Sequence, residues 1–112
     1  MEAKHQKGMV SKLSLMVAYI QDGYFVYNEV NNTGPIDFII VHPETKDVQK
    51  IDAKTYSKRE TGEQAGTMIH RILSKEQKDL GVKIVYWDQE NKRRITVGKE
   101  EEDHVDNRTA GY

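Results

Sequence analysis

The branched aliphatic residues are the feature of this sequence that most restricts its fold. Isoleucine and valine number 9 and 10 in 112 residues, against 4 leucines and 2 phenylalanines. Branching at Cβ suits a side chain to the pleated surface of a sheet better than to a helix. We therefore expect an α/β domain centred on a sheet. So few apolar residues in so short a chain can build one hydrophobic core but not two.

Absent residue types and segments exclude several classes of protein. The chain has no cysteine, which excludes a disulfide framework, a thiolate zinc site and a cysteine nucleophile. No apolar run approaches the roughly 20 residues that span a bilayer. Residues 1–12 also lack the apolar stretch of a signal peptide. We therefore expect a cytoplasmic protein with no membrane partner.

The charge divides the chain into two unequal parts. The formal net charge is -1, from 17 basic and 18 acidic residues. Residues 99–112 hold two basic and five acidic residues, which leaves residues 1–98 with a net charge of +2. A charged segment with almost nothing to bury is typical of disorder. We expect a single domain over residues 1–98 and an acidic, disordered tail over residues 99–112.

The first half of the chain has the pattern of a helix followed by three strands. The apolar positions of residues 10–20 have helical spacing, and we expect them to form the buried face: Val10, Leu13, Met16, Val17 and Ile20. Gly23 is suited to end this helix, because glycine adopts the left-handed conformation without a steric penalty. Strands are predicted over residues 24–30, 36–41 and 48–55. The second strand is nearly all apolar, so we expect it to lie centrally, covered on both faces.

The second half has the pattern of a loop, a helical region and a strand pair. Residues 56–67 are polar, contain two glycines and predict a loop. Helical spacing follows at four apolar positions: Met68, Ile69, Ile72 and Leu73. Ser74 and Gln77 match a capping box, so we expect one bent helical region that ends at Gly81. The last two strands are predicted over residues 82–87 and 93–97.

The hairpin between the second and third strands brings two acidic residues together. If residues 43–46 form its loop, Asp37 lies directly opposite Asp52. Opposed Cβ atoms in such a pair are about 4.5 to 5.5 Å apart, and like charges at that distance destabilise a hairpin. Lys54 is two residues from Asp52 on the same strand and therefore points to the same face. One lysine cannot balance two carboxylates, so a further cation is expected.

A hard divalent cation fits this group. Mg²⁺ prefers carboxylate and carbonyl oxygens, and the backbone carbonyl of Ala53 lies between the two side chains of its strand. A metal ion beside a lysine is suited to hydrolysis of a phosphodiester, because it activates water and neutralises the phosphoryl oxygens. A structural alternative stays open. Asp37 could cap the preceding Gly-Pro turn, and Asp52 and Lys54 could belong to an ordinary exposed strand face.

These residues also resemble a known group of enzymes. The run GPIDFIIV, followed after a turn by IDAK, resembles the signature of the PD-(D/E)xK nuclease superfamily. Asp37 takes the first acidic position, and Asp52, Ala53 and Lys54 take the tripeptide. The preceding KGMVSKLSLMVAYIQDGYFVY is similar to the opening helix and strand of Holliday-junction-resolvase-like and phage homing-endonuclease-like members. The resemblance covers residues 7–87.

The resemblance implies a fold, a cofactor and a substrate. The fold would be α/β, with a restriction-endonuclease-like core in the order α-β-β-β-α-β and a mixed sheet flanked by helices. Asp37 and Asp52 would bind Mg²⁺ or Mn²⁺, and Lys54 would position the water that attacks DNA. The protein would be a homodimer or a larger homo-oligomer, because so short a chain carries one half of an apparatus that cuts duplexes. The phage-encoded members, homing-like or junction-resolving, are the most similar.

The sequence departs from the superfamily pattern at two places. Pro35 and Asp37 are separated by one residue, which matters little because the motif is loose. Many members carry a glutamate on the first helix, but residues 8–20 contain no acid and Lys12 stands near the expected position. Glu29 could supply a third carboxylate to the metal, or it could be an ordinary strand residue. The missing acid leaves a second hypothesis open, a catalytically silent DNA-binding or assembly module with the same fold.

Basic residues after the tripeptide are the candidates for DNA contact. Residues 53–83 carry a net charge of +3, and basic clusters bind phosphates without regard to base sequence. Lys58 and Arg59 directly follow the proposed site, although they could equally belong to a solvated loop. The other candidates are Arg71, Lys75 and Lys78.

Overall fold

A computed structural model describes residues 3–58, 62–63 and 66–96 of the chain. The elements are α1 (Ala3–Gln21), β1 (Phe25–Asn28), β2 (Phe38–Val41), β3 (Val48–Thr55), α2 (Lys75–Leu80), β4 (Val82–Asp88) and β5 (Arg93–Thr96). The predicted order of elements is confirmed. The acidic tail predicted over residues 99–112 lies outside the described residues. No helix in the described part is long and apolar enough to cross a membrane.

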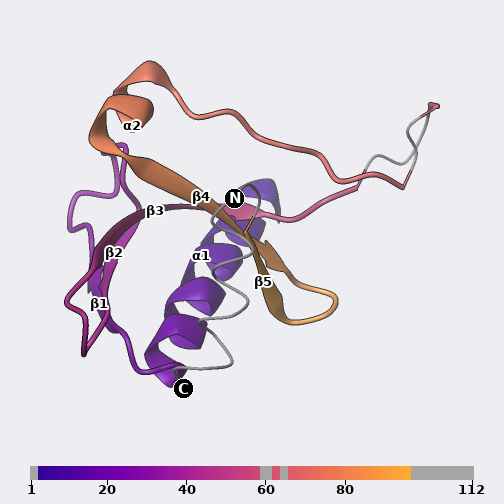
Figure 1. Ribbon diagram of the computed structural model, residues 1–112. Coiled ribbons are helices and arrows are strands. Elements are labelled where there is room, and N and C mark those ends of the chain that lie inside the picture. The colour runs from indigo at the N-terminus through magenta and orange to yellow at the C-terminus, as the bar shows by residue number, and fades with distance from the viewer. Residues whose placement is uncertain (1–2, 59–61, 64–65, 97–112) are drawn as a thin grey trace.

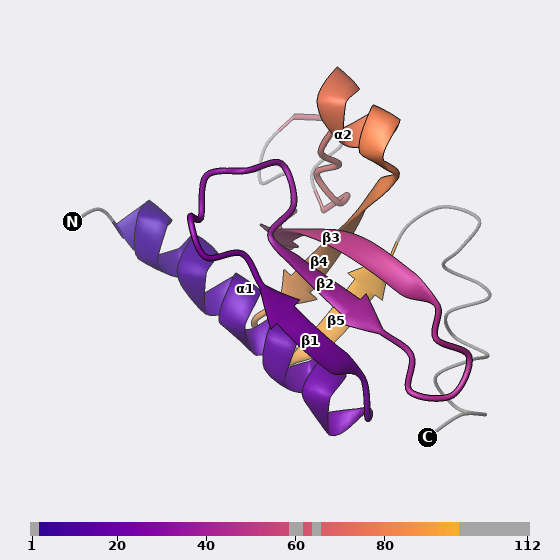
Figure 2. The same cartoon turned by 90° about the vertical axis from the view of Figure 1, so that its left-hand side faces the viewer.

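The five strands form one mixed sheet in the order β1-β2-β3-β4-β5. Strands β3 and β4 are parallel, and the other three pairs are antiparallel. Figures 1 and 2 show α1 lying along one face of the sheet and α2 at the end where β4 begins. A parallel pair needs a long crossover connection, and the segment between β3 and β4, which includes α2, provides it. The predicted mixed α/β fold with a sheet flanked by helices is confirmed.

The hydrophobic core lies between α1 and the sheet. Alternate residues of each strand point toward the helix, because successive side chains of a strand face opposite ways. The core consists of Leu15, Tyr19, Phe38, Ile40, Ile51, Val85 and Trp87. In β3, Ile51 and Ala53 point toward α1. Asp52 and Lys54 alternate with them and therefore lie on the sheet face away from α1.

The prediction of the buried face of α1 was wrong. The helix buries Leu15 and Tyr19 together with Ser11 and Lys12, whereas Leu13 is 51% exposed. The two polar residues have partners: Ser11 Oγ lies 2.7 Å from Thr55 Oγ1, and Lys12 Nζ donates to Asn32 Oδ1 at 2.7 Å. α1 therefore has two apolar sides, and periodicity identified the one that the sheet does not cover.

Two further predictions need correction. Residues 68–74 are not helical: Met68 pairs with Lys58 in an isolated bridge, and the Ile69 N–H donates to the Ser57 carbonyl at 2.9 Å. Residues 68–73 would make fewer than two helical turns, and so short a helix is marginal, so hydrogen bonds to a neighbouring segment outweigh the spacing. Strand β2 is fully buried on one face but only partly buried on the other, and it lies between β1 and β3, while β3 occupies the centre of the sheet.

Candidate functional site

The site is built where β2 and β3 separate. Strand β2 begins at Phe38, whereas β3 continues to Thr55 and there pairs only with β4. The Asp37 N–H donates to the Ile51 carbonyl at 2.8 Å, and the Asp37 carboxylate accepts from the Ala53 N–H at 2.7 Å. The Asp37 side chain therefore takes the place of a β2 backbone acceptor at this point. Both the backbone N–H and the carboxylate of Asp37 are held by hydrogen bonds to β3.

Asp52 and Lys54 lie beside Asp37 as predicted. Strand pairing ends at Phe38 and Ile51, and Asp37 lies just beyond it, with its carboxyl group in contact with that of Asp52. The Asp52 side chain is only 9% exposed, and Lys54 Nζ lies 3.5 Å from its Oδ2. The structure therefore brings these three side chains together, and their roles as metal ligands and catalytic lysine stay a prediction.

The surroundings of Asp52 favour its protonated form. Burial raises the pKa of Asp52 most, and the neighbouring Asp37 raises it further by a hydrogen bond and by its charge. The Lys54 ammonium and a hydrogen bond from Gln77 lower it, but the pKa still lies at about 6, compared with 3.8 for an ordinary aspartate. Two adjacent carboxyl groups with one ammonium are therefore short of positive charge at neutral pH.

Gln77 joins the site from α2, and sequence reasoning assigned it only to the helix cap. Its Oε1 accepts from the Ser74 N–H at 3.0 Å, which completes the predicted capping box. Its Nε2 donates to the Pro35 carbonyl at 2.9 Å, and its amide also hydrogen-bonds Asp52. One side chain thus ties the helix start to the turn before Asp37 and to Asp52. The capping box revealed the residue, but no local pattern shows that α2 lies over this end of the sheet.

No third carboxylate joins Asp37 and Asp52 from Glu29 or from the first helix in the part of the chain that the structure describes. The Glu29 carboxylate accepts from the Gly34 N–H at 2.7 Å and so holds the turn between β1 and β2. Among the residues that the structure describes, no group of three or more His, Cys, Asp or Glu side chains is arranged to hold a metal. Lys12, near the position where an acid was expected, is buried. Any metal at this site would therefore rest on two carboxylates.

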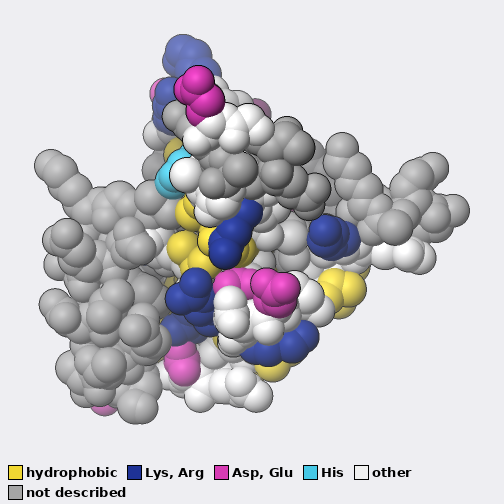
Figure 3. Space-filling model, turned by 90° about the vertical axis from the view of Figure 1, so that its right-hand side faces the viewer, with side chains coloured by type: hydrophobic (Ala, Val, Ile, Leu, Met, Phe, Trp, Pro, Cys, Tyr) yellow, Lys and Arg dark blue, Asp and Glu magenta, His cyan; other side chains and the backbone are white. Residues whose placement is uncertain are grey.

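The predicted DNA-contact residues are exposed where the structure describes them: Lys58, Arg71, Lys75 and Lys78. Arg59 lies outside the described residues. The Arg71 N–H donates to the Tyr86 hydroxyl at 2.7 Å, and Tyr86 pairs in register with Lys54. Lys75 is bound by Asp79 at 3.0 Å. On the face in Figure 3, basic side chains lie around a small acidic group, so the charge there is mixed rather than uniformly basic.

The oxygen donors of the site fit Mg²⁺. Mg²⁺ is commonly held by one or two carboxylates together with waters and substrate phosphates. Asp37 and Asp52 provide two such carboxylates at one point, and a cation there would offset both the burial and the neighbouring charge that raise the pKa of Asp52. The Ala53 carbonyl, between Asp52 and Lys54 in sequence, is the further oxygen proposed from the sequence.

Comparison with known proteins supports the fold. No protein-family profile and no curated protein sequence matches this chain. Among solved structures, the chain is similar to the bacterial homing endonuclease I-Ssp6803I, with a TM-score of 0.62 and 9% sequence identity. The match covers 86% of this chain and 69% of that one. At this identity the likeness establishes a nuclease-like fold, and membership of the PD-(D/E)xK superfamily stays a prediction.

Proposed function

We propose that this protein is a divalent-metal-dependent DNA endonuclease that hydrolyses phosphodiester bonds. The observation that carries the proposal is the juxtaposition of Asp37, Asp52 and Lys54 at the separation of β2 and β3. The similarity of the fold to a homing endonuclease adds independent support. On the sequence resemblance, the enzyme is of the homing-like or the junction-resolving kind.

The chain's own residues would divide the chemistry between them. A bound Mg²⁺ would supply neutralisation of the phosphoryl oxygens and a lower pKa for the attacking water. Asp37 and Asp52 would hold the ion, and the backbone contacts of Asp37 keep its carboxylate in place. Lys54 would donate to the phosphate or orient the water, because its ammonium is partly exposed beside Asp52. The water oxygen would form a bond to phosphorus and lose a proton to solvent as the bond to the leaving sugar oxygen breaks, and that sugar oxygen would take up a proton from solvent.

Metal-dependent cleavage of a DNA panel tests this function. We expect the purified chain to cut DNA with Mg²⁺ or Mn²⁺ and to lose all cleavage with excess chelator. A junction-resolving enzyme would cut branched DNA in preference to any linear duplex, whereas a homing-like enzyme would cut or nick one linear site. The linear arm uses a randomised duplex library, so that every short target sequence is represented.

The second candidate function is a DNA-binding or assembly module without catalysis. The observation that favours it is the first helix, which places a buried Lys12 where many superfamily members carry an acid. If DNA binding persists while no metal supports cleavage of any form in the panel, this function replaces the first.

Substitution of Gln77 tests whether this residue positions the site as well as capping α2. In Gln77→Glu the capping box is retained, since glutamate serves at this position, but a hydrogen-bond donor to Asp52 becomes a negative charge. We expect the pKa of Asp52 to rise. The acid limb of the pH profile of cleavage, where the rate increases with pH, should therefore move to higher pH. Cleavage at pH 7 should fall by about 10-fold or more.

The matched control is Ser74→Ala, which removes the N-cap side chain without touching Asp52. It should lower the free energy of unfolding by about 1 kcal/mol and leave the pH profile of cleavage unchanged. If both variants shift the profile equally, Gln77 acts only through the helix.

A further inference from the structure

The outer face of α1 carries apolar side chains that no described part of the chain covers. Its large residues are between 38% and 56% exposed: Met9, Val10, Leu13, Val17 and Ile20. The helix is held to the sheet by its opposite side, through Leu15 and Tyr19. This face is therefore left exposed after the fold has formed its core.

The spacing along this face is that of a coiled-coil seam. Val10, Leu13, Val17 and Ile20 follow one another at intervals of three, four and three residues, which correspond to positions a, d, a and d of two heptads. Valine at a with leucine at d, as at Val10 and Leu13, is a combination that favours pairing of two helices. The seam is thus arranged for another helix rather than for water.

The same face has no charge. Lys12 is the only charged residue from Met9 to Gln21, and it is buried on the other side of the helix with its ammonium on Asn32. Depletion of charged residues is the compositional mark of the centre of a protein interface. A nucleic acid would find no cation here, and a charged partner would find no counter-charge.

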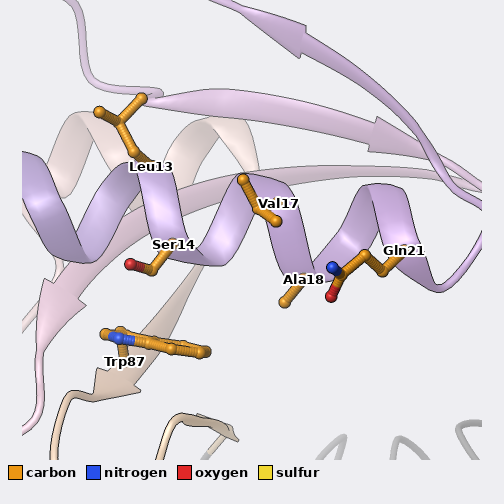
Figure 4. Close-up of a pocket in the computed structure, with 6 residues that line it drawn as sticks. All are labelled: Leu13, Ser14, Val17, Ala18, Gln21 and Trp87. Atoms are coloured by element: carbon orange, nitrogen blue, oxygen red, sulfur yellow. The ribbon is translucent and has the colours of Figure 1, made fainter.

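A hollow of about 300 Å³ adjoins the seam. It is lined by Leu13, Ser14, Val17, Ala18, Gln21 and Trp87. Figure 4 shows Ser14 and Ala18 projecting from α1 toward the Trp87 ring, with open space between them. Its small lining residues on the helix leave room for an apolar side chain from outside.

The chain beyond the described residues is a poor occupant for this face. Residues 97–112 contain five acidic residues and only two branched aliphatic ones, Val97 and Val105. Such a segment cannot cover two heptads of apolar surface. A second copy of the chain offers the same uncharged seam, and a two-fold arrangement brings like surfaces together without charge repulsion.

We propose that the outer face of α1 is a self-association surface that binds α1 of a second copy. This proposal identifies a surface and does not depend on catalysis. If the proposed function also holds, one consequence follows. Asp52 and Lys54 lie on the sheet face away from α1, so pairing through α1 leaves both sites uncovered on opposite sides of the dimer. Each copy would then engage its own segment of DNA.

Sedimentation equilibrium of the full chain without DNA tests the surface. We expect the wild type to be a dimer, and the Leu13→Glu variant to have a dissociation constant at least about 100-fold higher, because dimerisation would bury an unpaired carboxylate. Ile72→Glu is the matched control: Ile72 belongs to the segment before α2 and is 87% exposed, and its variant should dimerise like the wild type. Circular dichroism and thermal unfolding verify that the variants are folded.

Cysteine cross-linking gives a second measurement. Because the sequence has no cysteine, an introduced cysteine is the only thiol that can form a disulfide. Under mild oxidation Leu13→Cys should form a disulfide-linked dimer, whereas Glu44→Cys, on the exposed hairpin loop, should not. A wild type that stays monomeric up to roughly 1 mM, or a Leu13→Glu dimer as tight as the wild type, would overturn the proposal. Cleavage by a monomer would refute this surface and leave the proposed function intact, and a dimer that cuts no DNA would do the reverse.

Discussion

Replacing Asp52 with Asn is expected to lower Mg²⁺-dependent DNA cleavage by about 1000-fold or more. The substitution keeps the size of the side chain and its place beside Lys54, but removes one of the two carboxylates on which a metal would rest. Asp37→Asn should have a similar effect. Lys54→Ala should lower cleavage by about 100-fold to 1000-fold while metal binding, measured by calorimetry, is retained.

The matched control for these substitutions is Asp47→Asn, at the other end of β3 on the exposed hairpin loop. It makes the same change of carboxylate to amide and should leave cleavage unaltered. Cleavage by Asp52→Asn or Lys54→Ala at the wild-type rate would show that the reaction occurs elsewhere, and the assignment of the site would then be wrong.

The stability of the metal-free protein should fall as the pH rises through about 6. The pKa of Asp52 in the folded chain is raised to about 6 from 3.8, so folding favours the protonated carboxyl. This contribution is fully present below about pH 4, the pKa of the unfolded chain, and is lost as the pH rises through the folded value. We expect a loss of about 1–3 kcal/mol from this pair of carboxyl groups between pH 4 and 7.

Chemical denaturation in chelator, compared between wild type and Asp52→Asn, measures this effect. The variant should be more stable than the wild type at pH 7.5 and nearly equal to it at pH 4. Mg²⁺ should stabilise the wild type more at pH 7.5 than at pH 5, since it binds the ionised form. Equal slopes of stability against pH in the two proteins would contradict the raised pKa.

The comparison of variants is needed because Asp88 acts in the opposite direction. Burial raises the pKa of Asp88, but hydrogen bonds from Asn91, Arg93 and the Glu90 N–H lower it more. Its contribution to stability is therefore lost as the pH falls. This contribution is common to wild type and Asp52→Asn and cancels in their difference.

Local patterns in the sequence were sufficient for the strand pairing that builds the site. The hairpin register that pairs Phe38 with Ile51, and so leaves Asp37 beside Asp52, follows from the positions of the turn residues and of the apolar runs on either side. The capping box at Ser74 and the left-handed Gly81, with φ 75°, were predicted for the same reason. Each of these features depends on residues that are near one another in the chain.

Other features depended on contacts between distant segments. Periodicity alone could not say which side of α1 the sheet covers, because Leu13 and Leu15 both belong to apolar stripes and only the fit to Phe38 and Ile51 selects the second. The apolar residues of the segment 68–73 have helical spacing. The backbone of this segment nevertheless donates hydrogen bonds to the Ser57 carbonyl, just after β3, and to the Tyr86 hydroxyl.

The sequence by itself therefore determined the order of the elements, the hairpin and the adjacent carboxylates. Only the tertiary structure decided that Gln77 reaches Asp52 from α2, and that a second apolar face of α1 remains exposed. The physical reason is the range of the interactions. Turns, caps and strand alternation depend on residues that are neighbours in the sequence. The packing of a helix on a sheet depends on residues that are distant in the sequence and come together only in the folded chain.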